Sequence, residues 1–333
     1  MTGSKALVSQ ALSMLQENIE RTGDPLGFRH AYWTEWASGL GLPHGGPQVL
    51  LTARMYQMLP YLTQTTAMVE KFKPLVASRS MRKLVAAGSR LAGEMIVRRR
   101  AEANAAELKT RCDHILQGIV AALASAGIHP GYLYEDEPYS GALLYDLGLE
   151  GIALHAQKVY RQLKDSGVRE VITVDPHTTY MLRTIYPQFI EPFELQVTHY
   201  LDLLATHDMA ASQTNMEKLP TSFVVHDSCV MARHLMISKP LRTVVDGLHL
   251  SCKEPENTGN CTACCGGPIE YAFGELSEKI SEIRIAELAA VEKNVLVACP
   301  ICLVNLGKHQ VEAGPNVYDI GESLYSAYVG ERV

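Results

Sequence analysis

The stretch Val295-Leu296-Val297-Ala298-Cys299-Pro300-Ile301-Cys302 joins a short apolar run to a Cys-x-x-Cys turn. A run of aliphatic and β-branched residues of this length predicts a strand that is buried on both faces, as in a parallel sheet. An earlier stretch, Val171-Ile172-Thr173-Val174-Asp175-Pro176-His177-Thr178, has the same form, with proline at the same place. The sequence therefore predicts one strand-to-loop unit that occurs twice.

Two further pairs of segments support this internal repeat. A strand end at Val49–Arg54 matches one at Val224–Cys229, and the turn Tyr139-Ser140-Gly141 matches Cys264-Cys265-Gly266. The spacing agrees, because 34 residues separate Ser140 from Asp175 and 33 separate Cys265 from Cys299. An amphipathic helix pattern fills both intervals, around 152–166 and 276–292. Alternation of strands and helices predicts an α/β fold of two pseudo-repeated domains, each with a small parallel sheet and helices.

The predicted domain boundaries follow from the repeat. We expect N-terminal helices or a linker over 1–45, a first domain over 46–210 and a second over 211–333. The first domain carries about 50 additional residues in the region 73–125, whose composition favours helix. This insertion is basic, with eight Lys or Arg and three Glu between Met81 and Arg111. A solvated helix face, a docking surface for a partner protein and a contact with an anionic membrane surface are the three interpretations.

The bulk composition excludes several classes of protein. A formal charge of −6 does not favour nucleic acid as a partner. No apolar run reaches the roughly 18 residues of a transmembrane segment, and the N-terminal residues lack the pattern of a signal peptide. The expected location is cytoplasmic, with any membrane contact made peripherally through partner proteins.

Cysteine usage is the strongest chemical feature. Seven of the eight cysteines lie between Cys229 and Cys302, and Cys112 stands apart. In a chain without a secretion signal, such crowding favours metal binding over a disulfide framework. Five of these cysteines follow predicted strands, so their thiolates are expected to converge at the carboxyl ends of one sheet: Cys229, Cys264, Cys265, Cys299 and Cys302.

The pattern favours an iron–sulfur cluster. Thiolates select zinc, copper(I) or iron–sulfur clusters, and five of them exceed the four of a structural zinc site. Neighbouring side chains in the pair Cys264-Cys265 diverge, which suits different irons better than one zinc. Gly266 and Gly267 let the backbone approach inorganic sulfide. Zinc remains the alternative.

The roles of the other cysteines and histidines are secondary. Cys261 is a spare ligand, a redox thiol or a plain loop residue, whereas Cys112 and Cys252 are expected to be packing residues. Three histidines are surface or hydrogen-bonding residues, or else donors to cluster sulfur that tune its potential: His226, His234 and His309.

The spacing Cys229-x34-Cys264-Cys265-Gly266-x32-Cys299-x-x-Cys302 resembles the cysteine-rich CCG domain of the heterodisulfide reductase family. The segments His226–Cys229 and Arg233-His234 are similar to the start of that domain. The resemblance covers nearly the whole chain, since members usually carry two such domains in tandem. It implies an unusual noncubane [4Fe–4S] cluster that handles disulfide and thiol substrates.

The first domain departs from the family pattern at every ligand position. Its residues there are not soft ligands: Arg54, Tyr139, Ser140, Asp175 and Thr178. We infer that this domain kept its fold and lost its cluster. Arg54 and Asp175 are expected to neutralise each other in the vacated pocket, or to form a polar pocket for an anionic substrate.

The segment Asn18–Gly27 and the pair Trp33 and Trp36 resemble the linker after a ferredoxin-like domain in fused members of the family. The chain lacks the cysteine run of a ferredoxin. The resemblance therefore implies a separate ferredoxin-like partner protein within a larger complex, as in sulfur-oxidising heterodisulfide reductase-like complexes.

Three functions remain open from the sequence. The main hypothesis is a redox subunit that acts on disulfide, persulfide or thiol substrates and is active within its complex. The second is an electron-relay subunit of a 2-hydroxy acid oxidase that works with a flavoprotein. The third is a zinc-stabilised assembly protein without a redox role.

Overall fold

The computed structural model describes residues 2–72, 95–207, 219–270, 273–310 and 314–330. It confirms the predicted α/β architecture with two four-stranded parallel sheets. The strand order is β2-β1-β3-β4 in the first sheet and β6-β5-β7-β8 in the second. The second order is the first with each strand number raised by four, so the internal repeat is present in the topology.

The first sheet and its helices come from the N-terminal part of the chain. The strands are β1 (Gln48–Leu51), β2 (Gly131–Tyr132), β3 (Glu170–Thr173) and β4 (Gln196–His199). The helices are α1 (Thr2–Thr22), α2 (Met55–Phe72), α4 (Ala106–Ser125), α5 (Ala142–Asp146), α6 (Ile152–Asp165), α7 (Pro176–Tyr180) and α8 (Tyr200–Leu204).

The second sheet repeats this order of elements. Its strands are β5 (Ser222–Val225), β6 (Ser251–Lys253), β7 (Asn294–Val297) and β8 (Asn316–Asp319). Its helices are α9 (Ser238–Gly247), α10 (Gly274–Ala289), α11 (Pro300–Gly307) and α12 (Ile320–Tyr328).

The two apolar runs that define the repeat are central strands and share one register. Val171 of β3 pairs with Val49 of β1, and Val295 of β7 pairs with Val224 of β5. All four residues of β7 are buried. Burial on both faces explains the unbroken apolar runs, because helices cover each side of a parallel sheet.

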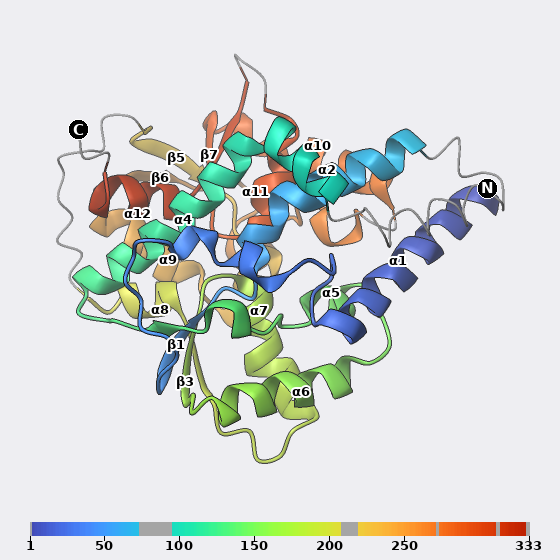
Figure 1. Cartoon of the computed structure of the whole chain (residues 1–333). Coiled ribbons are helices and arrows are strands. Elements are labelled where there is room, and N and C mark those ends of the chain that lie inside the picture. The colour runs from blue at the N-terminus through green and yellow to red at the C-terminus, as the bar shows by residue number, and fades with distance from the viewer. Residues whose placement is uncertain (1, 73–94, 208–218, 271–272, 311–313, 331–333) are drawn as a thin grey trace.

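The two halves contact each other through two helix pairs, and each pair has one helix from each half. Helix α4 of the first half packs on α12 of the second, and α9 of the second packs on α8 of the first. In Figure 1, α4 crosses between the strands β1 and β3 and the strands β5 and β7. Because α4 corresponds to α9 and α8 to α12, both contacts join the same two kinds of helix.

Glycine permits the close contact between α4 and α12. A Cβ atom on Gly118 would lie 2.5 Å from the carbonyl oxygen of Gly321, and it would also meet the backbone nitrogen of Tyr325. Beside this contact, the rings of His114 and Tyr325 stack with centroids 4.0 Å apart. Arg111 also forms an ion pair of 2.8 Å with Glu322.

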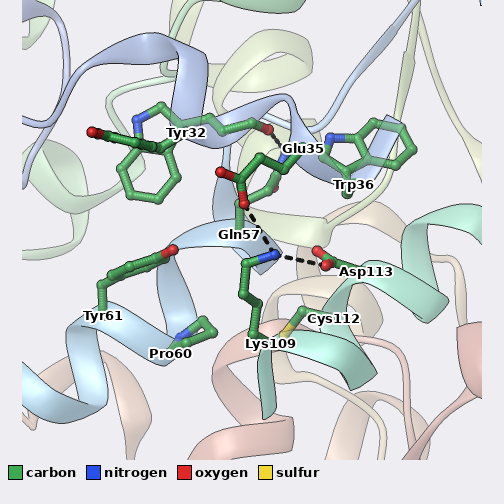
Figure 2. Close-up of a pocket in the computed structure, with 10 residues that line it drawn as sticks. Tyr32, Glu35, Trp36, Gln57, Pro60, Tyr61, Lys109, Cys112 and Asp113 are labelled. Atoms are coloured by element: carbon green, nitrogen blue, oxygen red, sulfur yellow. Dashed lines mark hydrogen bonds and ion pairs between the residues drawn. The ribbon is translucent and has the colours of Figure 1, made fainter. Parts of the chain in front are cut away.

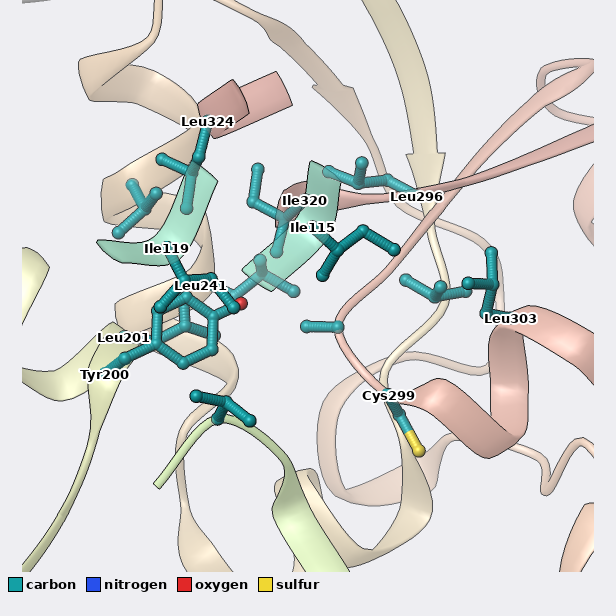
Figure 3. Packing of buried hydrophobic residues seen from close by; sticks show 14 of the residues in the cluster. Ile115, Ile119, Tyr200, Leu201, Leu241, Leu296, Cys299, Leu303, Ile320 and Leu324 are labelled. Carbon is teal, nitrogen blue, oxygen red and sulfur yellow. The ribbon is translucent and has the colours of Figure 1, made fainter. Parts of the chain in front are cut away.

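One hydrophobic core extends across both halves. Figure 3 shows Ile115 and Ile119 of α4 packed against Ile320 and Leu324 of α12 in the second half. Cys299 lies at the edge of this core, with its sulfur directed away from the apolar side chains. The core thus fixes the backbone of one candidate ligand while leaving the sulfur on the side of the site.

The predicted helical segment 73–125 is described only in part, since residues 73–94 lie outside the described residues. Residues 95–104 and α4 are helical. Within the repeat, α4 holds the place of α9. The N-terminal segment packs on the first half, where Trp33 and Trp36 are each 1% exposed. Among the described helices, none is both long and apolar enough to cross a membrane.

Candidate metal centre

The five cysteines lie at the carboxyl ends of the strands of the second sheet. Cys229 follows β5, the pair Cys264-Cys265 lies in the connection after β6, and Cys299 follows β7 as the N-cap of α11. Cys302 lies in the first turn of that helix. This is the edge at which open α/β sheets bind ligands.

The five thiol groups form one series along this edge of the sheet. The sulfur of Cys229 lies 3.8 Å from that of Cys264, and the sulfur of Cys265 lies 3.4 Å from that of Cys302. Cys264 and Cys265 are neighbours in the chain and so link these two pairs, and Cys299 lies three residues before Cys302 at the start of α11. All eight cysteines of the chain are free thiols. The structure therefore brings together the five sulfurs that the spacing predicted to converge.

Ionic contacts hold the connection after β6 against the end of β5. The carboxylate of Asp227 accepts bonds of 2.5 Å and 2.8 Å from Arg242 and one of 2.9 Å from the backbone N–H of Gly259. The hydroxyl of Thr262 donates to the carbonyl of Asp227 at 2.9 Å. Because Asp227 is fully buried, these charge-assisted bonds fix the loop that carries Cys264 and Cys265.

The turn at Gly266 brings the cysteine pair to the site. Gly266 has φ +81° and a Cβ there would lie 2.8 Å from the carbonyl of Ser277, so the position requires glycine. Backbone N–H groups of Gly266 and Gly267 donate to the sulfurs of Cys264 and Cys265, at 3.3 Å and 3.4 Å. These N–H donors stabilise thiolate character.

His226 places a ring nitrogen beside the sulfurs of the site. Its Nδ1 accepts a bond of 3.1 Å from Nε of Arg284, and Arg is always a donor. The proton of the neutral ring is therefore on Nε2, which is buried and has no hydrogen-bond partner among the described residues. A ring nitrogen of His226 and the sulfurs of Cys265 and Cys302 all lie within 4.8 Å of one another.

This donor set fits an iron–sulfur cluster. Five sulfurs exceed the four ligands of a tetrahedral zinc ion. An N–H group at His226 cannot ligate a metal, but it can donate to inorganic sulfide or to a thiolate. Burial and the neighbouring Arg284 lower the pKa of His226 to about 3, so the ring stays neutral.

The five thiols differ in pKa, which is lowered for two of them and raised for three. Hydrogen bonds from Cys229 and Cys265 lower the pKa of Cys264. Burial acts against ionisation of Cys299, but hydrogen bonds with Cys302 and His177 outweigh it and lower the pKa of Cys299 well below its usual value. The pKa values of the other three thiols are raised, because each faces a neighbouring thiolate. Thiolates are the metal-binding form of cysteine.

The other cysteines and histidines that the sequence singled out have different surroundings. Cys261 is exposed, and Cys112 is buried in the core between the halves. Cys252 is half-buried in β6. The ring of His234 lies 4.8 Å from that of Tyr180, and His309 bonds to the hydroxyl of Ser281 at 2.7 Å. Of the three histidines considered from the sequence, His226 is the one whose ring nitrogen lies beside cysteine sulfur.

The first half retains the geometry of the site with other atoms. Gly141 has φ +79°, matching the +81° of Gly266. The hydroxyls of Ser140 and Thr178 lie 3.2 Å apart, where the second half has the sulfurs of Cys265 and Cys302. Hydroxyl groups replace thiols without a change of fold.

The expected pairing of Arg54 with Asp175 is wrong. Arg54 forms a buried ion pair of 3.1 Å with Asp24 and donates to the carbonyl of Glu137. Asp175 instead caps α7 by accepting from the backbone N–H of Thr178 at 2.9 Å. Asp24 belongs to the N-terminal segment that the sequence places outside the domain, so the repeat alone does not indicate its charge as a partner.

A second polar cluster lies beside α4. Figure 2 shows Lys109 between Glu35 and Asp113, at 3.3 Å and 2.9 Å. Arg98 covers the ring of Tyr32 at 3.5 Å. Lys109 and Arg98, two cations in the described part of the basic segment, therefore contact other side chains of the same chain.

Three contributors to the site were missed from the sequence. Arg284 and Asn305 lie on α10 and α11, where Asn305 donates to the carbonyl of Cys265 at 2.5 Å. His177 comes from the other half of the chain. Only His177 had a usable indication, since it lies inside the repeated loop Asp175–Thr178.

Comparisons with known proteins agree with this location. Residues 223–307 match the CCG cysteine-rich domain family. The chain is 26% identical over 229 residues to the probable iron-sulfur-binding oxidoreductase FadF of Bacillus subtilis, covering 66% of this chain and 32% of that protein. It is 27% identical over 233 residues to the EtfAB:quinone oxidoreductase of Syntrophomonas wolfei subsp. wolfei, covering 65% and 32%. The chain thus spans about a third of the length of these relatives. Its second half carries a CCG cysteine-rich domain, and about two thirds of the chain is distantly similar to two oxidoreductases.

Proposed function

We propose that Cys229, Cys264, Cys265, Cys299 and Cys302 bind one iron–sulfur cluster of the noncubane [4Fe–4S] type. The observation that carries the proposal is the placement of these five cysteines at the carboxyl ends of the second sheet, with sulfur–sulfur contacts of 3.8 Å and 3.4 Å. A bound cluster would supply one-electron redox chemistry. The chain would then be an iron–sulfur oxidoreductase subunit, in line with its similarity to FadF, a probable iron-sulfur-binding oxidoreductase.

The accessible edge of the site indicates where a substrate or electron partner would approach. Cys265, Cys299 and Cys302 are buried, whereas Cys229 and Cys264 are partly exposed. The preferred substrate is a small disulfide, persulfide or thiol, as in heterodisulfide reductase-like complexes. Electrons would be exchanged with a ferredoxin-like partner protein, as the resemblance to heterodisulfide reductase-like complexes implies.

A relay function is the second candidate. One relative is named EtfAB:quinone oxidoreductase, which points to electron exchange between a protein and a quinone in that relative. On this alternative the site passes electrons from a flavoprotein, as it would in a 2-hydroxy acid oxidase, and binds no sulfur substrate. The half-buried edge at Cys229 and Cys264 would then face a protein partner.

Reoxidation kinetics separate these candidates. The protein is purified anaerobically, reduced with a low-potential dye and mixed with either a small organic disulfide or a water-soluble quinone. Rapid reoxidation by the disulfide, with release of thiol, is expected for the sulfur function. Reoxidation by the quinone alone would contradict it and support the relay. A colourless protein that holds zinc would contradict both.

A further inference from the structure

Helix α10 faces the candidate metal centre with polar side chains. Ser277 and Arg284 of this helix are buried. The hydroxyl of Ser277 donates to the carbonyl of Gly266 at 2.8 Å, next to the cysteine pair. Nε of Arg284 donates to Nδ1 of His226 at 3.1 Å. The polar side of α10 is therefore its inner side.

Apolar side chains of the same helix are exposed instead. Phe273 at the N-cap is 61% exposed, Leu276 is 50% exposed and Ile283 is 72% exposed. Ile280, which lies between them in the sequence, is partly buried. Steps of three and four residues place these four side chains along one side of the helix, and we call them the α10 stripe. Because a surface helix normally buries its apolar residues, a row of exposed ones indicates an interaction surface.

The α10 stripe begins at the turn that carries the cysteine pair. The backbone N–H of Phe273 donates to the carbonyl of Ile269, the last residue of the helical turn after Gly266, at 2.8 Å. A Cβ on Gly266 would lie 3.1 Å from the Cβ of Ile280, so Ile280 packs against the backbone that follows Cys265. A protein bound on the stripe would lie within about 10–12 Å of this backbone, the width of one helix with its side chains. Electrons pass between redox centres in proteins over such distances.

The charges beside the α10 stripe indicate the chemistry of a partner. Glu275, Glu278 and Glu282 are exposed on α10. Lys279 is the one exposed cation of this helix, all of whose residues are described. Three carboxylates beside one ammonium make the surface acidic, in a chain of formal charge −6. A second copy of the chain or an anionic membrane would meet like charge there, whereas a surface rimmed by Lys and Arg would meet opposite charge.

We propose that the α10 stripe docks the redox partner of the metal centre, a protein whose own redox group lies at an apolar surface ringed by Lys and Arg. In each encounter one electron leaves the reduced centre and the redox group of the partner accepts it. The apolar row excludes water from the contact, and the carboxylates steer the partner toward it. The inference rests on the proposed iron–sulfur function, because it requires a redox centre behind α10.

Ferric cytochrome c is a suitable probe, because its haem edge lies at an apolar surface ringed by lysines. The chain is purified anaerobically, its iron and sulfide are quantified, and it is reduced and then freed of the reductant by gel filtration. Stopped-flow absorbance measures the second-order rate constant for the formation of ferrous haem. Sedimentation measures the oligomeric state of the same samples.

Two double variants test the stripe and its charges. Leu276→Ser/Ile283→Ser should lower the rate constant about tenfold or more, because the apolar contact is lost. Glu278→Lys/Glu282→Lys should lower it about tenfold or more at low ionic strength, and the loss should shrink as salt screens the charges. Both variants should keep the iron content and EPR spectrum of the wild type, since the changed side chains are exposed.

Matched controls change exposed side chains of the first half. Leu154 on α6 is exposed to the same extent as Ile283, and Glu150 is also exposed. Leu154→Ser and Glu150→Lys remove the same kinds of group at a different place on the surface. Both should leave the rate constant unchanged.

The opposing results are distinct. Full iron content with wild-type rate constants in both double variants overturns the inference alone. If the serine double variant loses iron, the lysine double variant decides, and an unchanged rate constant there overturns the inference. A dimer of the wild-type chain that the serine changes dissociate also overturns it, because the stripe would then bind a second copy. Wild-type protein without iron and sulfide overturns the proposed function, and this inference with it.

Discussion

Ser140 and Thr178 face each other through hydroxyl oxygens 3.2 Å apart, in the place where the second half sets the sulfurs of Cys265 and Cys302 at 3.4 Å. The turn before each pair has nearly the same backbone, with φ +79° at Gly141 and +81° at Gly266. Hydroxyls are poor ligands for soft metals, whereas thiolates are good ones. One backbone geometry therefore serves as packing in the first half and as a candidate metal site in the second.

The ion pair between Arg54 and Asp24 should be essential for stability. The side chains are 1% and 0% exposed, so removing one partner leaves the other charge buried and uncompensated. Asp24→Asn is expected to lower the free energy of unfolding by about 3–5 kcal/mol. Urea unfolding followed by circular dichroism measures the change. The double variant Arg54→Met/Asp24→Leu should lose less than Asp24→Asn alone, and an equal or larger loss would contradict this account.

The contact between α4 and α12 should depend on glycine. Gly118→Ala places a methyl group against the backbone of Gly321 and Tyr325. A loss of roughly 1–3 kcal/mol in the free energy of unfolding is expected from the overpacking. Gly274→Ala is the control, because a Cβ at this helical position meets no atom within 4 Å. Equal stability of the two variants would show that the helices can move apart freely.

Asp319 should make stability depend on pH. This carboxyl caps α12 and accepts a bond of 2.8 Å from Tyr56. Burial raises its pKa from 3.8 to about 7, so the folded state holds a proton that the unfolded state releases above pH 4. The stability that this proton gives is complete below pH 4 and is lost as the pH rises through 7.

Asp319→Asn should remove this dependence, since the amide stays neutral. The difference in unfolding free energy between variant and wild type should shift in favour of the variant by up to about 1.4 kcal/mol per pH unit between pH 5 and 7. Chemical denaturation at several pH values measures it. A difference that stays constant with pH would contradict the assignment of the titration to Asp319.

The repeat, the parallel sheets and the convergence of five cysteines could all be predicted, because apolar runs and cysteine spacing are local features of the sequence. The ion pair of Arg54 with Asp24 could not, since 29 residues separate these partners and the sequence places Asp24 in a linker. The same holds for Arg284 and His177. Each reaches the site across an interface whose geometry depends on how helices and halves pack.

The most direct test of the central claim is the iron, acid-labile sulfide and zinc content of the anaerobically purified chain. The account predicts a brown protein with about four iron and four sulfide per chain. Serine variants at Cys229, Cys264, Cys265, Cys299 or Cys302 should lower the iron content, whereas Cys112→Ser and Cys252→Ser should not. A colourless protein with one zinc per chain, or iron content that none of the five variants changes, would contradict the account.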